Sequence, residues 1–530
     1  MREARPTSAQ RPPTWPGTLV AAISLVAAAA LCASAASGAG LGFLSDLDLR
    51  RPPLARLAPR LDRPAPALSR RILLVIIDGL GADRAGRLPN LDRLARTGTS
   101  GVAASHLPSL SRPNYVSIMT GVPPRHSGVR SNAYHWPLPL DSVLARARAA
   151  GLATALATDD ATGFAAMFAG QLDQIIVAPW QGPGRRWFLR PLLRGDALVV
   201  VILSGVDDAG HHHGAASREY RRAALEVDAA LGQLAGALDL ARDTIIVTAD
   251  HGHTDRGGHG GDEREVMRVP LVMAGAGVRR GTRLTGARLI DVAPTAAALL
   301  GLPGPGHALG RTLTEGLLVD RARAASLAGA DSNRLARLRA FVAHASAGPR
   351  HRVLGLAALL TAAALLAGVR MLRLERRAAL AAASGFPLAV IVLAIAVCRC
   401  EISLSALASH AEAKSRLLVA CVGVIAVQVA VFMAVLRGRV TPVDRLASGC
   451  RTAAAGLCAA VAVVAAAELA LALGGNALPP AGALLAIPLL RMSLAAYAMA
   501  VVVTLVSEIG LRAAAAAVAT RLGSRPFAIR

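Results

Sequence analysis

The C-terminal third of this 530-residue chain contains five long apolar runs rich in alanine, leucine and valine: 353–369, 378–398, 417–436, 452–473 and 489–511. Each run is close to the ~20 apolar residues that a helix needs to cross a lipid bilayer. The whole chain is 54% apolar with a mean hydropathy of +0.46, which is high for a protein that lies wholly in water. The sequence therefore predicts about five transmembrane helices between residues 353 and 511.

Another apolar run, residues 17–44, lies near the N-terminus and follows a short segment, 1–16, that carries several arginines. This run is long enough to be a transmembrane anchor. A cleaved signal peptide is the alternative, because Ala33-Ser34-Ala35 resembles a small-residue cleavage site. Both interpretations place the residues that follow outside the cytoplasm.

The charges of the connecting segments predict the orientation. Segments 370–377, 437–451 and 512–530 are rich in arginine, whereas 474–480 has no charge. Cytoplasmic loops carry an excess of positive charge, so residues 1–16 and the tail 512–530 are expected in the cytoplasm and residues 45–350 outside it. The bias toward arginine and alanine is typical of bacteria. We therefore expect an integral protein of a bacterial cytoplasmic membrane.

The formal net charge of +24 does not indicate nucleic-acid binding. Aromatic residues, on which single-stranded nucleic acids stack, make up only 3% of the chain, and Lys414 is its only lysine. The cysteines restrict the chemistry further, since none lies between residues 45 and 345. A metal bound in that segment must therefore be held by histidine and carboxylate.

After a linker rich in proline and arginine, residues 45–70, the composition of 71–345 becomes that of a globular domain. Short runs that are apolar on both faces predict buried parallel strands, namely RILLVIID, ALVVVILS, TIIVTAD and VPLVMAG. They alternate with helical patterns such as 214–238 and 290–301. We expect an α/β fold, with a mostly parallel sheet covered by helices on both faces.

Polar residues follow three of these predicted strands: Asp78-Gly79, then Asp207-Asp208-Ala209-Gly210-His211, then Asp250-His251-Gly252, with Gly257-Gly258-His259-Gly260 close behind. Any one of them is explained by ordinary turn chemistry. Ligands of open α/β sheets, however, bind at the carboxyl ends of the strands. Together the three groups favour a two-metal site with nitrogen and oxygen ligands, for which zinc is the first candidate.

The order of these motifs, with Ser111 and Pro113 between the first and second, resembles the alkaline phosphatase superfamily and its type I phosphodiesterase/nucleotide pyrophosphatase branch. The resemblance covers about residues 70–315, including the run 290–313. It implies an alkaline-phosphatase-like fold and two divalent metal ions. One would be held by Asp207, His211 and His259, and the other by Asp78, Asp250, His251 and the oxygen of Ser111. Asp208 is an alternative to Asp207. For His212, His213 and His253, an exposed or supporting position is as consistent with the sequence as a role as a ligand.

Pro113 suits the first turn of a helix, which places Ser111 at a helix N-terminus, where an anionic phosphate is favoured. The resemblance makes Ser111 the nucleophile and Asn114 the residue that holds a non-bridging phosphate oxygen. The alternatives are that Ser111 only caps the helix and that Asn114 only lies on its surface. Arg112 would contact either phosphate or solvent. Tyr115 stands where a sulfatase would have arginine, which argues against that branch.

The expected activity is that of a membrane-anchored, metal-dependent phosphodiesterase or phosphotransferase with a phospho-serine intermediate. Its substrate would be a phosphodiester or a phospholipid head group. One anchor, an outer domain and a multi-span tail resemble the layout of GPI ethanolamine phosphate transferases, although hydrolase and transferase remain equally open. A transporter with a degenerate outer domain is a third hypothesis, suggested by Glu468 and Arg491 in or near predicted spans.

Overall fold

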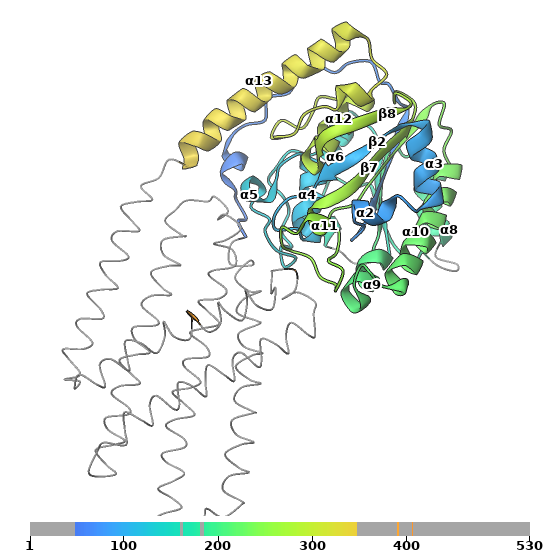
Figure 1. The fold of residues 1–530 in the computed structure, drawn as a ribbon. Coiled ribbons are helices and arrows are strands. Elements are labelled where there is room, and N and C mark those ends of the chain that lie inside the picture. The colour runs from blue at the N-terminus through green and yellow to red at the C-terminus, as the bar shows by residue number, and fades with distance from the viewer. Residues whose placement is uncertain (1–47, 160–162, 181–184, 347–389, 392–404, 406–530) are drawn as a thin grey trace, which may run out of the picture.

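The structure is a computed structural model and describes residues 48–159, 163–180, 185–346, 390–391 and 405 (Figure 1). The predicted membrane spans, Glu468, Arg491 and both predicted cytoplasmic segments lie outside the described residues. None of the helices in the described ranges combines the length and the apolar character that a bilayer span requires.

The core of the domain is one eight-stranded sheet in the order β4-β3-β5-β1-β6-β7-β2-β8. The central strand β1 (Arg71–Ile77) pairs in parallel with β5 (Leu198–Leu203) and β6 (Asp243–Thr248), and every residue of these three strands is buried. The other strands are β2 (Thr99–Ala104), β3 (Thr154–Thr158), β4 (Gln174–Val177), β7 (Arg268–Gly275) and β8 (Thr282–Arg288). The predicted α/β sheet is confirmed.

One strand runs in a direction that differs from the prediction. The VPLVMAG run lies in β7, which is antiparallel to both of its neighbours, β6 and β2. A parallel neighbour needs a crossover connection, usually a helix packed on the sheet. Residues 249–267 contain only the one-turn helix α11 (Arg264–Met267), so the chain turns back at the same edge of the sheet. The sheet is therefore mixed.

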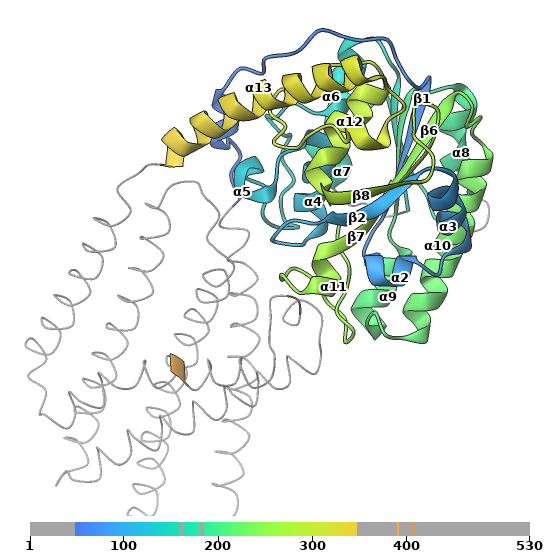
Figure 2. The ribbon, with the colours of Figure 1, turned by 45° about the horizontal axis from the view of Figure 1, so that its top comes forward.

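Helices cover both faces of the sheet, as predicted. Figures 1 and 2 show α3 (Pro89–Thr97), α8 (Arg185–Arg194) and α10 (Arg218–Gly236) on one face, with α4 (Ser111–Thr120), α6 (Val143–Ala149) and α12 (Val292–Leu299) on the other. The shorter helices are η1 (Pro53–Arg56), α2 (Ala82–Ala85), α5 (Pro124–Ser127), α7 (Phe164–Met167), α9 (Gly205–His213), η3 (Leu289–Asp291) and η4 (Thr314–Gly316). The helices predicted at 214–238 and 290–301 correspond to α10 and to η3 with α12.

The long helix α13 (Arg321–Ser346), at the end of the domain, packs against η1 at its start. Its Leu338 is fully buried in a small cluster with Leu54 of η1, Val122 and Leu140. The chain ahead of β1 is therefore packed onto the domain through η1, although the sequence suggested only a linker there (Figure 2).

Candidate active site

The carboxyl ends of β1, β5 and β6 lie at one edge of the sheet, because the three strands are parallel neighbours. Asp78 follows β1, Asp207 lies in the first turn of α9 after β5, and Asp250 and His251 follow β6. Two groups of side chains form there. The first cluster is Asp207, His211, His253 and His259, and the second cluster is Asp78, Asp250 and His251. Within each cluster the potential ligand atoms lie within 4.8 Å of one another.

Helix α9 explains the spacing of the D-x-x-G-H motif. Asp207 and His211 are four residues apart, so they lie on the same face of the helix, with Asp207 Oδ2 3.3 Å from His211 Nε2. Asp208, His212 and His213 are exposed and belong to neither cluster. The structure thus brings together the residues that the resemblance selected and leaves out their neighbours.

The first cluster has the hydrogen bonding expected of metal ligands. His259 donates Nδ1–H to the carbonyl of Ser109 at 2.8 Å, which leaves a lone pair on Nε2. This Nε2 lies 3.0 Å from Nε2 of His211. At this distance His211 Nε2–H can donate to His259 Nε2, and the same two nitrogens are close enough to bind one cation together.

His253 has a different role. Its Nδ1 accepts the backbone N–H of Gly258 at 3.1 Å, so Nε2 carries the proton and donates to Asp207 Oδ1 at 2.7 Å. A protonated Nε2 is not a metal ligand. This hydrogen bonding fits the supporting role for His253, through the carboxylate of Asp207, which is one of the two alternatives that the sequence left open.

The second cluster also fits a cation. His251 donates Nδ1–H to the carbonyl of Gly252 at 3.2 Å, and its Nε2 lies 3.2 Å from Asp250 Oδ2 and 3.4 Å from Asp78 Oδ1. Both of these carboxylate oxygens are buried and have no hydrogen-bond partner. Buried acceptors without a donor are costly, and a divalent cation bound among them removes that cost.

The two clusters adjoin. The rings of His251 and His259 stack with centroids 3.7 Å apart, and Asp207 Oδ1 lies 3.9 Å from His251 Nε2. Gly79 permits this approach, because it has a φ of +77° and a Cβ there would lie 2.7 Å from Cα of Asp207.

The pKa shifts show how strongly these groups are removed from water. Burial, followed by the charges of Asp250 and Asp207, raises the pKa of Asp78 well above its usual value. Burial and Asp207 raise the pKa of Asp250 to about 7. Burial lowers the pKa of His259 to about 3 and that of His251 well below the usual range. A metal ion binds imidazoles in their neutral form, and its positive charge stabilises carboxylates that lie close together. Both features are present in the two clusters.

Tyr115 is a supporting residue that the sequence analysis did not assign. Its side chain is fully buried, and its hydroxyl donates to Asp78 Oδ2. The residue that argued against a sulfatase thus orients a carboxylate of the second cluster.

Ser111 is the first residue of α4, which begins after the N-cap residue Leu110. Its Oγ lies 3.3 Å from His251 Nε2, at the second cluster. The backbone N–H of Ser111 has no partner in the described part of the chain, whereas that of Arg112 is donated to Asn132 Oδ1 at 3.0 Å and Pro113 has none. The helix start therefore presents fewer free N–H groups than its sequence suggested.

Asn114 has partners other than the predicted phosphate. It is fully buried, its Oδ1 accepts the His106 N–H at 3.2 Å, and its Nδ2 donates to the carbonyls of His106, Pro108 and Leu110. Asn114 lies one turn into α4, where the loop 106–110 covers it. Asn132, which no sequence motif singled out, is instead the exposed amide beside the start of α4.

The loop that carries His259 is held from two sides. Ser109 Oγ donates to the Gly261 carbonyl at 2.7 Å and accepts the Gly260 N–H at 2.9 Å. Ser405 Oγ accepts the Gly261 N–H at 2.9 Å and donates to Glu263 Oε2 at 2.7 Å. Ser405 is thus a contact between the C-terminal half of the chain and this loop.

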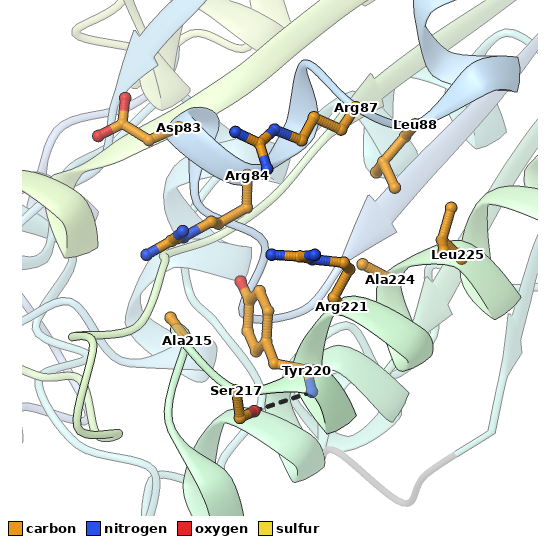
Figure 3. Close-up of a pocket in the computed structure, with 10 residues that line it drawn as sticks. All are labelled: Asp83, Arg84, Arg87, Leu88, Ala215, Ser217, Tyr220, Arg221, Ala224 and Leu225. Carbon is orange, nitrogen blue, oxygen red and sulfur yellow. Dashed lines mark hydrogen bonds between the residues drawn. The ribbon is translucent and has the colours of Figure 1, made fainter.

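A cavity of about 80 Å³ lies behind the first cluster, between α2 and α10. Figure 3 shows Arg84, Arg87 and Arg221 around it, with Tyr220 at its centre. The hydroxyl of Tyr220 donates to the Gly79 carbonyl at 2.7 Å. No residue of either cluster lines this cavity.

Comparison with known proteins confirms the predicted resemblance. The family of type I phosphodiesterases/nucleotide pyrophosphatases matches residues 72–145 and 165–265. GPI ethanolamine phosphate transferase 1 from Homo sapiens is 24% identical over 312 residues, which cover 47% of this chain and 33% of the relative. The corresponding transferase from Neurospora crassa is 29% identical over 279 residues, covering 44% of this chain and 27% of the relative. The chain thus spans about a third or less of these relatives.

Two further similarities are to a mutase and to a solved structure. A 2,3-bisphosphoglycerate-independent phosphoglycerate mutase from Cereibacter sphaeroides is 36% identical over 128 residues, 23% of this chain and 24% of the mutase. A solved structure from Vibrio parahaemolyticus, described as a protein in the alkaline phosphatase superfamily, has a TM-score of 0.39 at 18% identity and covers 54% of this chain and 79% of its own.

Proposed function

We propose that this chain, whose residues 72–145 and 165–265 carry the type I phosphodiesterase/nucleotide pyrophosphatase signature, is a two-metal phosphodiesterase or phosphotransferase with Ser111 as its nucleophile. The observation that carries the proposal is the position of Ser111 Oγ. It lies beside His251 Nε2 and two unpartnered carboxylate oxygens at the carboxyl edge of the sheet.

Asp207, His211 and His259 would hold one divalent cation, and Asp78, Asp250, His251 and Ser111 Oγ would hold the other; zinc suits these ligands. When bound, such a pair lowers the pKa of a hydroxyl and neutralises charge on a transferring phosphoryl group. His253 and Tyr115 keep two of the carboxylates oriented by hydrogen bonds to Asp207 and Asp78.

In the first step, Ser111 Oγ gives its proton to solvent and forms a bond to phosphorus, while the bond between phosphorus and the leaving oxygen breaks and that oxygen takes up a proton from solvent to leave as the alcohol. The Ser111 N–H and the amide of Asn132 are donors beside this position, suited to the non-bridging oxygens of the phosphate. In the second step, water or an acceptor alcohol attacks the phospho-serine and releases Ser111. Asn114 contributes by holding the loop 106–110.

We further propose that the domain acts outside the cytoplasm on a membrane phospholipid or another phosphodiester. This rests on the five apolar runs and the arginine distribution in the sequence, and on the names of the transferase relatives. The difference between hydrolase and transferase then depends on whether water or an alcohol accepts the phosphoryl group.

Two experiments test the proposal. Acid quenching of the enzyme during turnover of an aryl phosphodiester should trap the phosphoryl group, with its remaining ester substituent, on the peptide that contains Ser111, detectable by mass spectrometry. Phosphate on no peptide, with turnover intact, would contradict a covalent intermediate. The full chain in liposomes that contain phosphatidylethanolamine and a hydroxyl-bearing glycolipid should then form either a head-group-modified glycolipid, as a transferase does, or only free head-group phosphate, as a hydrolase does.

A further inference from the structure

The loop 128–136 lies beside the start of α4, and one side of it contacts Arg112. Asn132 Oδ1 accepts the Arg112 N–H at 3.0 Å, and the Arg112 guanidinium donates to the Tyr134 carbonyl at 2.8 Å. Both contacts are to the residue that follows Ser111. The other side of this loop faces away from α4, and its position depends on other parts of the chain.

That other side is held by Asp48, in the segment ahead of the catalytic domain. Asp48 Oδ1 accepts the N–H groups of Arg130 at 2.6 Å and Ser131 at 3.1 Å, and Oδ2 accepts the Ser131 hydroxyl at 2.5 Å. One carboxylate therefore satisfies three donors at the base of the loop. Hydrogen bonds to a carboxylate are stronger than those between neutral groups.

The neighbours of Asp48 add further contacts. Leu49 donates its N–H to the Gly128 carbonyl at 2.8 Å, and the Arg50 guanidinium lies 4.1 Å from the ring centroid of Trp136. Gly128 has a φ of +79°, and a Cβ there would lie 2.8 Å from the Leu49 carbonyl oxygen. Only glycine permits this approach, so both ends of the loop are fitted to residues 48–50.

We propose that Asp48 is a positioning residue that holds the loop 128–136 so that the amide of Asn132 stays at the start of α4, beside Ser111. This inference rests on the proposed function, in which Asn132 contacts the phosphate. It assigns a positioning role to a residue outside the segments that match the phosphodiesterase family, 72–145 and 165–265. The segment that leads into the domain is then part of the active-site support.

The test compares Asp48→Ala with Asp62→Ala in the full chain. Asp62 is an exposed carboxylate of the same segment, so its loss changes the net charge equally without touching the loop. In Asp48→Ala, hydrogen exchange at the amides of Arg130 and Ser131 should rise at least ~10-fold, and kcat/KM for an aryl phosphodiester should fall ~10- to 100-fold. Metal content should not change, and Asp62→Ala should match the unmodified protein.

A double-substitution comparison separates positioning from general destabilisation. If Asp48 acts through Asn132, Asp48→Ala should lower kcat/KM no further in a protein that already carries Asn132→Ala. Multiplicative losses, or unchanged exchange at residues 130 and 131, would overturn the proposal.

Asp48→Asn, which keeps the size and one acceptor oxygen, should give intermediate exchange and serves if the alanine variant does not fold. If Asn132→Ala alone leaves kcat/KM unchanged, the positioning proposal fails, whereas trapping phosphate on Ser111 still decides the proposed function independently.

Discussion

Nε2 of His211 lies 3.0 Å from Nε2 of His259, and the Nδ1–H of His259 is already donated to the Ser109 carbonyl. This geometry fits the proposed site, in which both nitrogens and a carboxylate oxygen of Asp207 would bind one cation. The second cluster offers a similar arrangement around Asp78, Asp250 and His251. These contacts lead to an expectation about metal content.

The purified protein should contain close to two zinc ions per chain. His211→Ala and His259→Ala should each lose about one ion together with activity, because each removes a ligand of the first cluster. Elemental analysis by mass spectrometry measures the ratio. His213→Ala, an exposed histidine of the same helix, is the matched control and should keep both ions. Two ions retained in both ligand variants would contradict the assignment.

Ser111→Ala should reduce turnover of an aryl phosphodiester by at least ~10³-fold, because the attacking oxygen is removed. Its fold and most of its metal should remain, since Ser111 lies after the N-cap residue of α4. Ser111→Thr should keep a measurable rate, because it retains the hydroxyl. Ser332→Ala, on an exposed face of α13, serves as the control. Turnover that survives in Ser111→Ala would mean that another group is the nucleophile.

Ser109→Ala should weaken metal binding at the first cluster by ~10- to 100-fold, the range for residues that orient ligands. The substitution removes the hydroxyl that bonds to both Gly260 and Gly261, so the loop that carries His259 loses one of the two side chains that hold it. Competition with a chelator measures the affinity of each ion. Equal affinities in the variant and the unmodified protein would show that this hydroxyl does not position His259.

His126 should make the domain sensitive to mild acid. Burial, followed by the charges of Arg125 and Arg130, lowers the pKa of His126 to about 4, from 6.5 in an unfolded chain. The folded state therefore resists protonation, and its stability is lost as the pH falls from about 6.5 toward 4. His126→Gln should reduce the loss of unfolding free energy between pH 7 and pH 5 by roughly 1–2 kcal/mol. Urea unfolding at the two pH values measures it, with His213→Gln as the exposed control.

Much of the site was predictable because its residues follow buried strands. Asp78, Asp207 and Asp250 each come soon after an apolar run, and parallel strands end at the same edge of a sheet. The direction of β7 was wrong in the prediction, since apolar content does not distinguish a parallel strand from an antiparallel one. The direction of β7 depends on the connection from β6, which contains no helix long enough to cross the sheet.

Other residues could not be found from local sequence. Asn132 and Asp48 lie in irregular segments, and each acts through contacts with residues far along the chain. The resemblance assigned a phosphate contact to Asn114, whereas in the structure its side-chain amide is hydrogen-bonded to the loop 106–110. Hydrogen-bond partners in loops depend on tertiary folding, which neither periodicity nor motif spacing encodes.

The hydrogen bonds of Ser405 to Gly261 and Glu263 connect the metal-ligand loop to the part of the chain that follows the catalytic domain. Energetic coupling between two sites is reciprocal. If a cation bound at His259 stabilises this loop, it also stabilises the hydrogen bonds of Ser405. Loss of the Ser405 contact would then lower the affinity for the cation by the same factor. The occupancy of the metal site and the strength of the contact at Ser405 would then change together.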